Sequence, residues 1–217
     1  MILLLYGAGG TAREVYDMIM RDTQNRWESI YFIDDFAEEG PCYLSESIHF
    51  NSIMDKFKGK MDQLEGVVTV GEPAHRELLY DRLNAANIKI ATLIDKSAVI
   101  SPTAFIGPGS IIFEMVRVHA NVEIGPGVLI QPYCAIGHDV KIGAHSVISA
   151  FATPGGNTTL GKRVFLGMHA TVKEKLIIGD DAIISMSAAV FRDLKPEVTV
   201  VGNPARETKG NIEHKVF

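Results

Sequence analysis

The residues whose types most clearly favour catalysis are a histidine and an aspartate side by side, His138 and Asp139, in the stretch AIGHDVKIG. An imidazole with an ordinary pKa of about 6.5 accepts a proton at neutral pH, and a neighbouring carboxylate can orient the ring and stabilise its charged form. Such a pair suits general-base catalysis, in which a nucleophile loses its proton as it attacks. The alternative is a polar pair that falls on a turn. The elements around the pair must decide between the two.

A second group of residues is typical of a phosphate-binding loop. The sequence GAGGTA at positions 7–12 follows a short apolar run, and glycine-rich turns of this kind bring backbone N–H groups and a helix N-terminus to a phosphate. Asp34 lies 22 positions after Ala12, where an acidic residue would meet a ribose. The N-terminal part is too short for two mononucleotide-binding halves, so we expect one nucleotide rather than NAD. A tight strand–helix turn without a ligand is the alternative.

The composition argues against several classes of protein. The chain has 217 residues, 47% hydrophobic and 22% charged, and it contains no apolar run long enough for a membrane span. The opening MILLLYGAGG lacks the basic start and cleavage pattern of a signal peptide. Two cysteines, Cys42 and Cys134, make no disulfide framework, and we therefore expect a cytoplasmic protein. A net charge of −5 argues against nucleic acid as a partner.

The second half of the chain repeats every six residues. From Ile94 to Val190, sixteen of the seventeen positions at this spacing are aliphatic, and only Pro154 departs. The residue four positions further on is usually small, and glycine often follows the aliphatic residue, as at Gly137 and Gly143. A period of six fits neither an α-helix nor a hairpin meander. It predicts a β-solenoid in which each hexad is one short strand plus a turn, and three hexads, or 18 residues, close a triangular coil.

The first ninety residues alternate between apolar runs and helix-like stretches. The apolar runs are Ile2–Tyr6, Ser29–Ile33, Val67–Val70 and Lys89–Leu93; the helix-like stretches are Arg13–Arg21 and Pro73–Ala86, and 36–66 is expected to form loops with a short helix. This alternation predicts a small α/β domain with a parallel sheet, half of a Rossmann-like fold, over residues 1–92. The repeat and a C-terminal tail then occupy residues 93–217. Because ligands bind beyond the carboxyl ends of parallel strands, Gly7–Gly10, Asp34–Asp35 and Gly71–Glu72 should converge.

This order of domains, with several motifs, resembles the bacterial UDP-amino-sugar N-acetyltransferases and the sialic acid O-acetyltransferases grouped with them. The similar stretches are LLYGAGGTAREV, YFIDDF, VTVGEPAHRELLYDRL, ATLIDKSAVIS and VVGNPAR, and the likeness extends over nearly the whole chain. These enzymes are hexapeptide-repeat left-handed β-helix acyltransferases. The resemblance implies that acetyl-coenzyme A is the co-substrate and lies between neighbouring β-helices of a homotrimer. It also implies a nucleotide sugar in the N-terminal domain. We expect no membrane insertion and no metal.

The resemblance further implies roles for individual residues. It makes His138 the general base, Asp139 the residue that orients it, and the Gly156 N–H the donor that stabilises the developing oxyanion. The residues expected to bind the nucleotide sugar are Gly7, Gly9, Gly10, Thr11, Asp34, Asp35, Gly71 and Gln131. Those expected to bind acetyl-coenzyme A are Gly155, Gly156, Lys162, Arg163, Lys173 and Arg206. Residues 160–217 carry nine Lys/Arg against seven Asp/Glu, a charge of +2, which suits an anionic ligand or a solvated surface.

Three positions differ from the family pattern. Gly137 stands where the family has a glutamate before the catalytic histidine, Val147 where it has a second histidine, and Gln131 where it has an asparagine. His145 lies two positions before Val147 and would face elsewhere. These differences leave the acceptor sugar open.

The leading hypothesis is N-acetylation of a UDP-linked amino sugar for bacterial surface glycan synthesis, with His138 as general base. The first alternative is O-acetylation of a sugar hydroxyl, as in sialic acid modification. The second is a catalytically degenerate trimer that only binds a sugar nucleotide. Zinc, which some β-helix enzymes bind through histidines five residues apart, is not expected, since His138 and His145 are seven apart.

Overall fold

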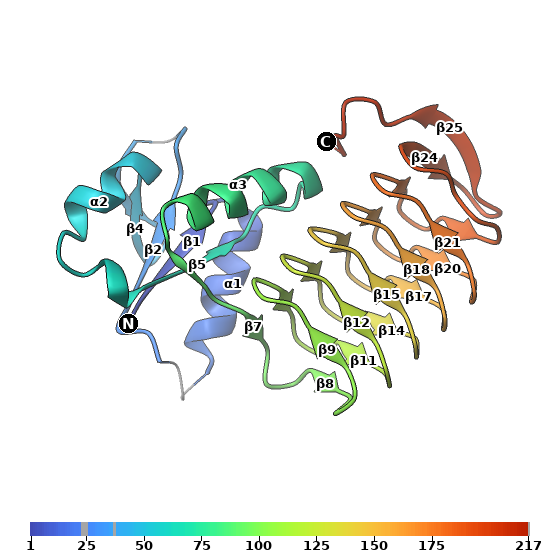
Figure 1. The fold of residues 1–217 in the computed structure, drawn as a ribbon, viewed down its shortest axis with the longest axis horizontal. Coiled ribbons are helices and arrows are strands. Elements are labelled where there is room, and N and C mark those ends of the chain that lie inside the picture. The colour runs from blue at the N-terminus through green and yellow to red at the C-terminus, as the bar shows by residue number, and fades with distance from the viewer. Residues whose placement is uncertain (23–25, 37, 217) are drawn as a thin grey trace. The chain divides into compact units, whose positions relative to one another are not determined.

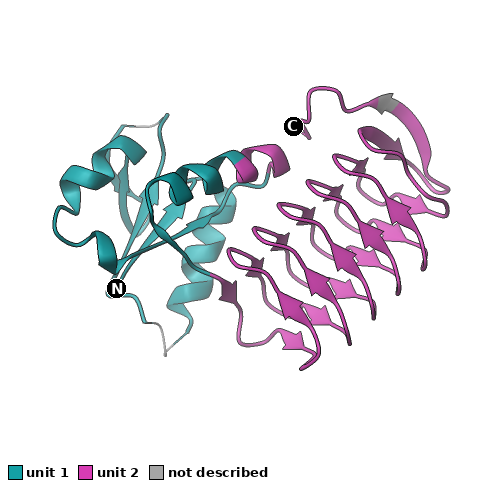
Figure 2. Ribbon diagram, in the orientation of Figure 1, with its two compact units in different colours: residues 1–71, 78–91 teal, residues 72–77, 92–217 magenta. Residues whose placement is uncertain are grey.

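The computed structural model describes residues 1–22, 26–36 and 38–216, which form two compact units (Figures 1 and 2). Unit 1 comprises Met1–Gly71 and Leu78–Ala91, and unit 2 comprises Glu72–Glu77 and Thr92–Phe217. Within the described ranges, no helix is both long enough and apolar enough to cross a membrane.

Unit 1 is built on a six-stranded sheet in the order β3-β4-β2-β1-β5-β6. Its elements are β1 (Ile2–Tyr6), α1 (Gly10–Met20), β2 (Ser29–Ile33), β3 (Gly40–Cys42), β4 (Ser45–Ile48), the 3₁₀ turns η1 (Phe50–Ser52) and η2 (Met61–Gln63), α2 (Ile53–Lys56), β5 (Leu64–Val68), α3 (Pro73–Ala85) and β6 (Lys89–Ile90). The central strand β1 pairs in parallel with β2 and β5, and all of its residues are buried. A continuous apolar run is what a strand covered on both faces requires. The predicted α/β domain with a parallel sheet is confirmed.

Strand β5 begins three residues before the apolar run from which it was predicted. The apolar pattern missed the start of the strand because its second residue, Glu65, is charged. The Glu65 side chain is nevertheless buried, with only 2% of it exposed. Its carboxylate accepts hydrogen bonds from Arg26 (2.5 Å) and the Trp27 indole (2.9 Å), and it pairs with Lys89 (2.9 Å). A buried charge is tolerated when it is paired in this way, and here it conceals the strand from a hydrophobic pattern.

Residues 36–66 contain the expected short helix, α2, and also two strands that the sequence did not predict. β4 pairs in parallel with β2, and β3 pairs antiparallel with β4, so this edge of the sheet is mixed. The sequences of the two strands are GPC and SESI, which are too short and too polar to show an alternating pattern. Ala37, at the start of this region, lies outside the described residues.

In unit 2 the six-residue repeat forms the strands, and every repeat position from Ile94 to Val190 ends a strand of two residues. These strands are β7 (Leu93–Ile94), β8 (Val99–Ile100), β9 (Phe105–Ile106), β10 (Ile111–Ile112), β11 (Arg117–Val118), β12 (Glu123–Ile124), β13 (Leu129–Ile130), β14 (Ala135–Ile136), β15 (Lys141–Ile142), β16 (Val147–Ile148), β17 (Thr153–Pro154), β18 (Thr159–Leu160), β19 (Phe165–Leu166), β20 (Thr171–Val172), β21 (Ile177–Ile178), β22 (Ile183–Ile184) and β23 (Ala189–Val190). Strands three apart pair in parallel, as in Ile112↔Ile130, so one coil takes 18 residues (Figure 1). The predicted left-handed β-helix is confirmed.

Pro154, the one break in the repeat, also breaks a sheet. Each face of the β-helix is made of every third strand. The face that runs from β7 through β10 to β22 and the face that runs from β9 through β12 to β21 are continuous ladders. The third face is divided into the sheets β14-β11-β8 and β17-β20-β23. The division falls between β14 and β17, where Pro154 has no N–H to donate to the coil below. Its carbonyl still accepts the Gly137 N–H at 3.1 Å, so the coils remain stacked.

The turns between strands bring successive coils very close together. From Ile106 to Ile184, the third residue after each inward side chain has left-handed backbone angles, as Asp139 (φ +58°) and Asn157 (φ +59°) do. The glycine that follows an inward residue lies against the next coil. A Cβ added to Gly137 would lie 2.6 Å from the backbone N of Gly156, and one on Gly143 would lie 2.4 Å from the Gly161 backbone. These positions therefore require glycine.

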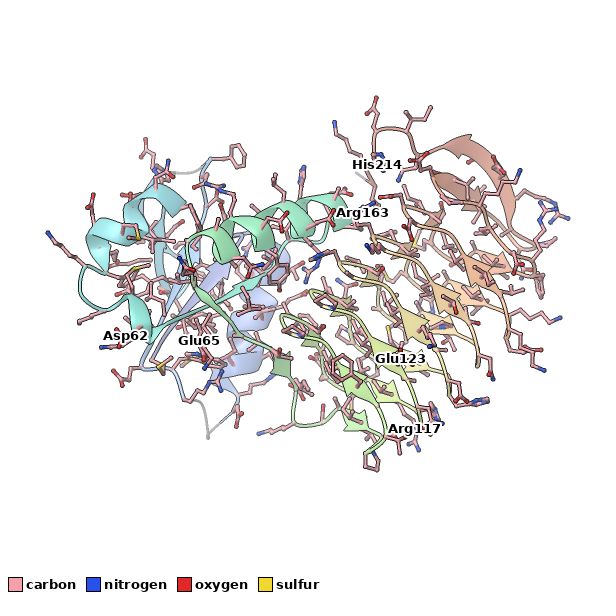
Figure 3. All side chains as sticks on the ribbon, viewed as in Figure 1. Asp62, Glu65, Arg117, Glu123, Arg163 and His214 are labelled. Atoms are coloured by element: carbon pink, nitrogen blue, oxygen red, sulfur yellow. The ribbon has the colours of Figure 1, made fainter. Side chains whose placement is uncertain are left out.

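The C-terminal end of the β-helix is covered by the strands β24 (Val198–Val201) and β25 (Arg206–Gly210), which pair antiparallel. The chain then returns, and the Asn211 amide donates to the Asp181 carbonyl at 2.9 Å. Arg163 and His214, both labelled in Figure 3, lie against the Asp181 carboxylate, at 2.7 Å and 3.1 Å respectively.

Candidate active site

His138 and Asp139 lie on the corner between β14 and β15, where the chain turns after the inward residue Ile136. Nδ1 of His138 is 2.8 Å from Oδ2 of Asp139, and the Asn121 amide donates to Oδ1 at 3.1 Å. The hydrogen bond from His138, followed by that from Asn121, holds the pKa of Asp139 below its usual range. An ionised carboxylate can only accept, so Nδ1 carries the proton and neutral His138 keeps its lone pair on Nε2. The side chains are 61% and 43% exposed, open to a substrate.

Gly156 lies beside Nε2 of His138, one coil further along. A Cβ on Gly156 would lie 2.7 Å from Nε2 and 2.9 Å from Cε1, so glycine is what leaves room for the ring. Its N–H meets no acceptor among the described residues, whereas the Gly155 N–H donates to the Val172 carbonyl at 2.8 Å. Of the two glycines, Gly156 is therefore the one whose N–H is available to an oxyanion.

The three positions that depart from the family pattern have structural settings of their own. Position 137 requires glycine because the backbone of the next coil leaves no room for a Cβ. Val147 lies in β16 and is 1% exposed, and His145 is on the following corner, between β15 and β16. The Gln131 side-chain oxygen accepts the Ala150 N–H at 3.1 Å, so this amide links two coils.

The glycine-rich loop of unit 1 leads into an uncapped helix N-terminus. Gly7 has φ +117° and donates its N–H to the Ile33 carbonyl at 2.9 Å, which places the loop beside β2. α1 begins at Gly10, three residues before the stretch predicted from its pattern, since glycine hides the start of a helix. No side chain caps this end, and its first turn has no acidic residue. A Cβ on Gly9 or Gly10 would meet nothing within 4 Å, so this backbone faces open space and suits a phosphate.

Asp34 and Asp35, at the carboxyl end of β2, have different partners. One oxygen of Asp34 accepts the Phe36 N–H at 2.9 Å. The Asp35 carboxylate accepts the Tyr6 hydroxyl (2.9 Å), the Arg82 guanidinium (2.6 Å) and the Phe50 N–H (2.8 Å). This geometry favours a structural role for Asp35 and leaves Asp34 as the better candidate for a ribose.

Replacing Asp35 by asparagine should lower the free energy of unfolding by about 2 kcal/mol at pH 7, because hydrogen bonds to a charged group are lost. Burial raises the pKa of Asp35, but its bonds to Phe50, Arg82 and Tyr6 outweigh burial and hold the pKa below the usual value. A depressed pKa stabilises the fold above the unfolded-state value of about 3.9, and this contribution is lost as the pH falls through the folded-state value. Urea unfolding should therefore separate the two proteins at pH 7 and bring them together once the pH has fallen below the folded-state pKa of Asp35. Asp34→Asn is the matched control, and an equal loss of stability in both variants would contradict the assignment.

A cavity of about 420 Å³, which was not predicted from the sequence, lies at the β3–β4 edge of the sheet. Its lining residues are Glu39, Gly40, Glu46, Ser47, Ile48, Ser52, Asp55 and Lys56. It adjoins Asp34, whose N–H donates to the Ile48 carbonyl at 3.1 Å. Strands β3 and β4 form part of its wall. Because these two strands were not predicted from the sequence, the cavity could not be predicted either.

The basic residues expected to bind coenzyme A fall into two groups. Arg163 is 22% exposed and is engaged by Asp181 at 2.8 and 2.7 Å and by Glu77 at 2.8 Å, so its guanidinium is part of the β-helix corner. Lys162, Lys173 and Arg206 are exposed. The exposed side chains remain the better candidates for an anionic ligand.

The predicted site residues thus form two sets, one in each unit. His138, Asp139 and Gly156 come together in unit 2, and the glycine loop with Asp34 forms the second set in unit 1. Across the described residues, no three His, Cys, Asp or Glu side chains gather as they would around a metal ion.

Family models match both units. The PglD N-terminal domain model matches residues 2–83, and the bacterial transferase hexapeptide model (six repeats) matches residues 121–153, the range that holds His138. The comparison with curated proteins returned no similar sequence.

Solved structures share the whole architecture. The acetyltransferase domain of PglB from Neisseria gonorrhoeae FA1090 is 26% identical with a TM-score of 0.88, covering 95% of this chain and 99% of that one, and it has also been solved with acetyl coenzyme A. WeeI from Acinetobacter baumannii AYE is 27% identical with a TM-score of 0.89, over 96% and 100% of the two chains. PerB from Caulobacter crescentus, solved with CoA and GDP-perosamine, shares the fold at 24% identity, with a TM-score of 0.83 over 96% and 98%.

Proposed function

Since this chain is an acetyl-coenzyme A-dependent acetyltransferase of the hexapeptide-repeat type with a PglD-type N-terminal domain, we propose that it acetylates the amino group of a nucleotide-linked amino sugar. The observation that carries the proposal is the geometry at one corner of the β-helix. There Asp139 fixes the tautomer of His138, and Nε2 of that ring lies beside Gly156. A base and an oxyanion donor side by side are what acyl transfer to an amine requires.

The reaction follows from these groups. The sugar amine attacks the thioester carbonyl, and Nε2 of His138 takes the proton that the amine loses. The Gly156 N–H stabilises the negative charge that develops on the carbonyl oxygen. When the tetrahedral intermediate collapses, the C–S bond breaks, and the thiolate of coenzyme A receives the proton from the imidazolium. The products are the N-acetylated sugar and free coenzyme A, and His138 returns to its neutral form.

The nucleotide part of the acceptor is assigned to unit 1. The uncapped N-terminus of α1 suits a phosphate, Asp34 suits a ribose, and the adjoining cavity has room for a base. We favour a uridine nucleotide because of the family resemblance. The matched PglD-type domain covers these residues. From the same resemblance, we propose that acetyl-coenzyme A binds along the β-helix, in the groove between subunits of a homotrimer.

O-acetylation of a sugar hydroxyl is the alternative, since the same base can deprotonate an alcohol. Gly137 favours keeping this alternative, because it replaces the glutamate that the family has beside the base. A degenerate protein that only binds the sugar nucleotide is disfavoured by the intact arrangement of His138, Asp139 and Gly156.

Release of free coenzyme A from acetyl-coenzyme A, measured with a panel of acceptors, tests the proposal. UDP- and GDP-linked amino sugars should support turnover, whereas the corresponding N-acetylated sugars, which have no free amine, should not. Free sialic acids form the third arm of the panel. Turnover with sialic acids alone would favour O-acetylation, and tight UDP binding without turnover on any acceptor would favour the degenerate protein.

A further inference from the structure

Asn121 lies one coil before Asp139 on the same corner of the β-helix. Both residues are the third after an inward side chain, Val118 and Ile136, which pair in the parallel ladder. Both have left-handed backbone angles, with φ +57° for Asn121 and φ +58° for Asp139. The stacking of coils therefore places the two side chains in adjacent rows, 18 residues apart.

The contact between them completes a chain of hydrogen bonds. The Asn121 Nδ2 donates to Oδ1 of Asp139 at 3.1 Å, and Oδ2 of the same carboxylate faces Nδ1 of His138 at 2.8 Å. A carboxylate held at one oxygen can rotate, and a carboxylate held at both cannot. The side chain of Asp139 is 43% exposed, so packing alone does not fix it.

From this juxtaposition we infer that Asn121 is a positioning residue for the reaction: it holds the Asp139 carboxylate in the orientation that keeps the proton on Nδ1 of His138 and leaves Nε2 free as the base. The inference rests on the proposed function. It concerns a residue that touches neither the acceptor nor the thioester, and it assigns no chemical step to Asn121.

The fold does not depend on the Asn121 side chain. Its backbone N–H donates to the Thr103 hydroxyl at 3.0 Å, and the Asp139 N–H donates to the Ala120 carbonyl at 2.9 Å. The left-handed conformation is tolerated by asparagine, aspartate and glycine. Two substitutions therefore remove the donor while keeping the corner: Asn121→Asp, which has the same shape, and Asn121→Gly.

We expect Asn121→Asp to lower kcat about 10-fold, because a second carboxylate opposes Asp139 and cannot donate to it. Asn121→Gly should lower kcat about 3- to 10-fold, since the donor is lost without repulsion. KM for acetyl-coenzyme A and for the sugar should stay within about twofold of wild type, because Asn121 contacts neither substrate and its loss should not weaken their binding. Asn87 is the matched control: it is exposed, has φ +55° and belongs to unit 1, so Asn87→Asp should retain the wild-type kcat.

The tautomer of His138 provides a reading that does not depend on turnover. In ¹⁵N NMR of histidine-labelled protein, wild-type His138 should show a protonated Nδ1 and a bare Nε2 at a pH where the ring is neutral. Both Asn121 variants should shift it toward a mixture of tautomers, with thermal unfolding close to wild type.

The outcomes separate this inference from the proposed function. Wild-type kcat and an unchanged tautomer in both variants would overturn the inference, while a strong loss in His138→Ala would still support the function. Full activity of His138→Ala would overturn the function and, with it, a role for Asn121 in the reaction. A fall in thermal stability that accounts for the lost kcat would also overturn the inference, because Asn121 would then be structural.

Discussion

Replacing His138 by alanine should lower kcat for acetyl transfer by roughly 10²- to 10⁴-fold, the usual contribution of a general base. The variant keeps acetyl-coenzyme A, the acceptor and the Gly156 N–H, but it lacks the imidazole proposed to take the proton from the attacking amine. Because the side chain is 61% exposed and, within the described part of the chain, hydrogen-bonds only to Asp139, removing it should leave the fold intact. Steady-state kinetics with the best acceptor of the panel measures the effect.

His119 supplies the control for this substitution. It follows the inward residue Val118 on the same corner one coil earlier, and it is exposed. His119→Ala removes a similar volume and the same chemical group from a neighbouring position, so it should change kcat by less than about twofold. If His138→Ala kept a rate close to that of His119→Ala, another group would have to be the base.

Gly156→Ala should lower kcat about 100-fold while the protein remains folded. The new methyl group would lie 2.7 Å from Nε2 of His138, closer than side chains pack, so the ring must turn away from Asp139. Displacing a catalytic group by about 1 Å costs a factor of this size, because the reacting atoms lose their alignment. The ring is exposed and free to move, which is why the fold should survive.

Gly155→Ala is the matched control, and we expect it to destabilise the fold instead of acting on the His138 ring. Its Cβ would lie 2.7 Å from the backbone N of Glu174, which cannot move without separating two coils. We therefore expect a loss of stability of about 1–3 kcal/mol from overpacking. The double variant His138→Ala/Gly156→Ala should be no slower than His138→Ala, since both changes remove the same function. A double variant much slower than either single change would show that Gly156 acts independently of the ring.

The sequence predicted the parts of the fold that follow a strict period. Sixteen aliphatic residues at a spacing of six can be buried by a triangular coil, and the strands of unit 2 end at those residues. It did not predict β3 and β4, because an edge hairpin of GPC and SESI has no apolar face to display. It also misplaced the start of β5, because the buried Glu65 is paired with residues far along the chain.

The candidate active site was also predicted only in part from the sequence. His138 and Asp139 are neighbours in the chain, so their types and order were enough to propose a base and its orienting carboxylate. Asn121 was missed although the signal was present: writing the chain in rows of 18 residues places it directly before Asp139. The pairing of Asp35 with Tyr6 and Arg82 left no signal in the sequence, since the partners are 29 and 47 residues away. The contacts of Arg163 with Asp181 and Glu77 likewise left no signal in the sequence, so its pairing became visible only in the structure.

The measurement that tests the central claim most directly is identification of the acetylated product. The purified protein is incubated with acetyl-coenzyme A and a UDP-linked amino sugar, and the sugar nucleotide is analysed by mass spectrometry and NMR. We expect the sugar nucleotide to gain one acetyl group on its amino nitrogen, coenzyme A to be released in equal amount, and His138→Ala to form the product far more slowly. An acetyl group found on a hydroxyl, or an amino sugar recovered unchanged from every nucleotide tested, would contradict the claim.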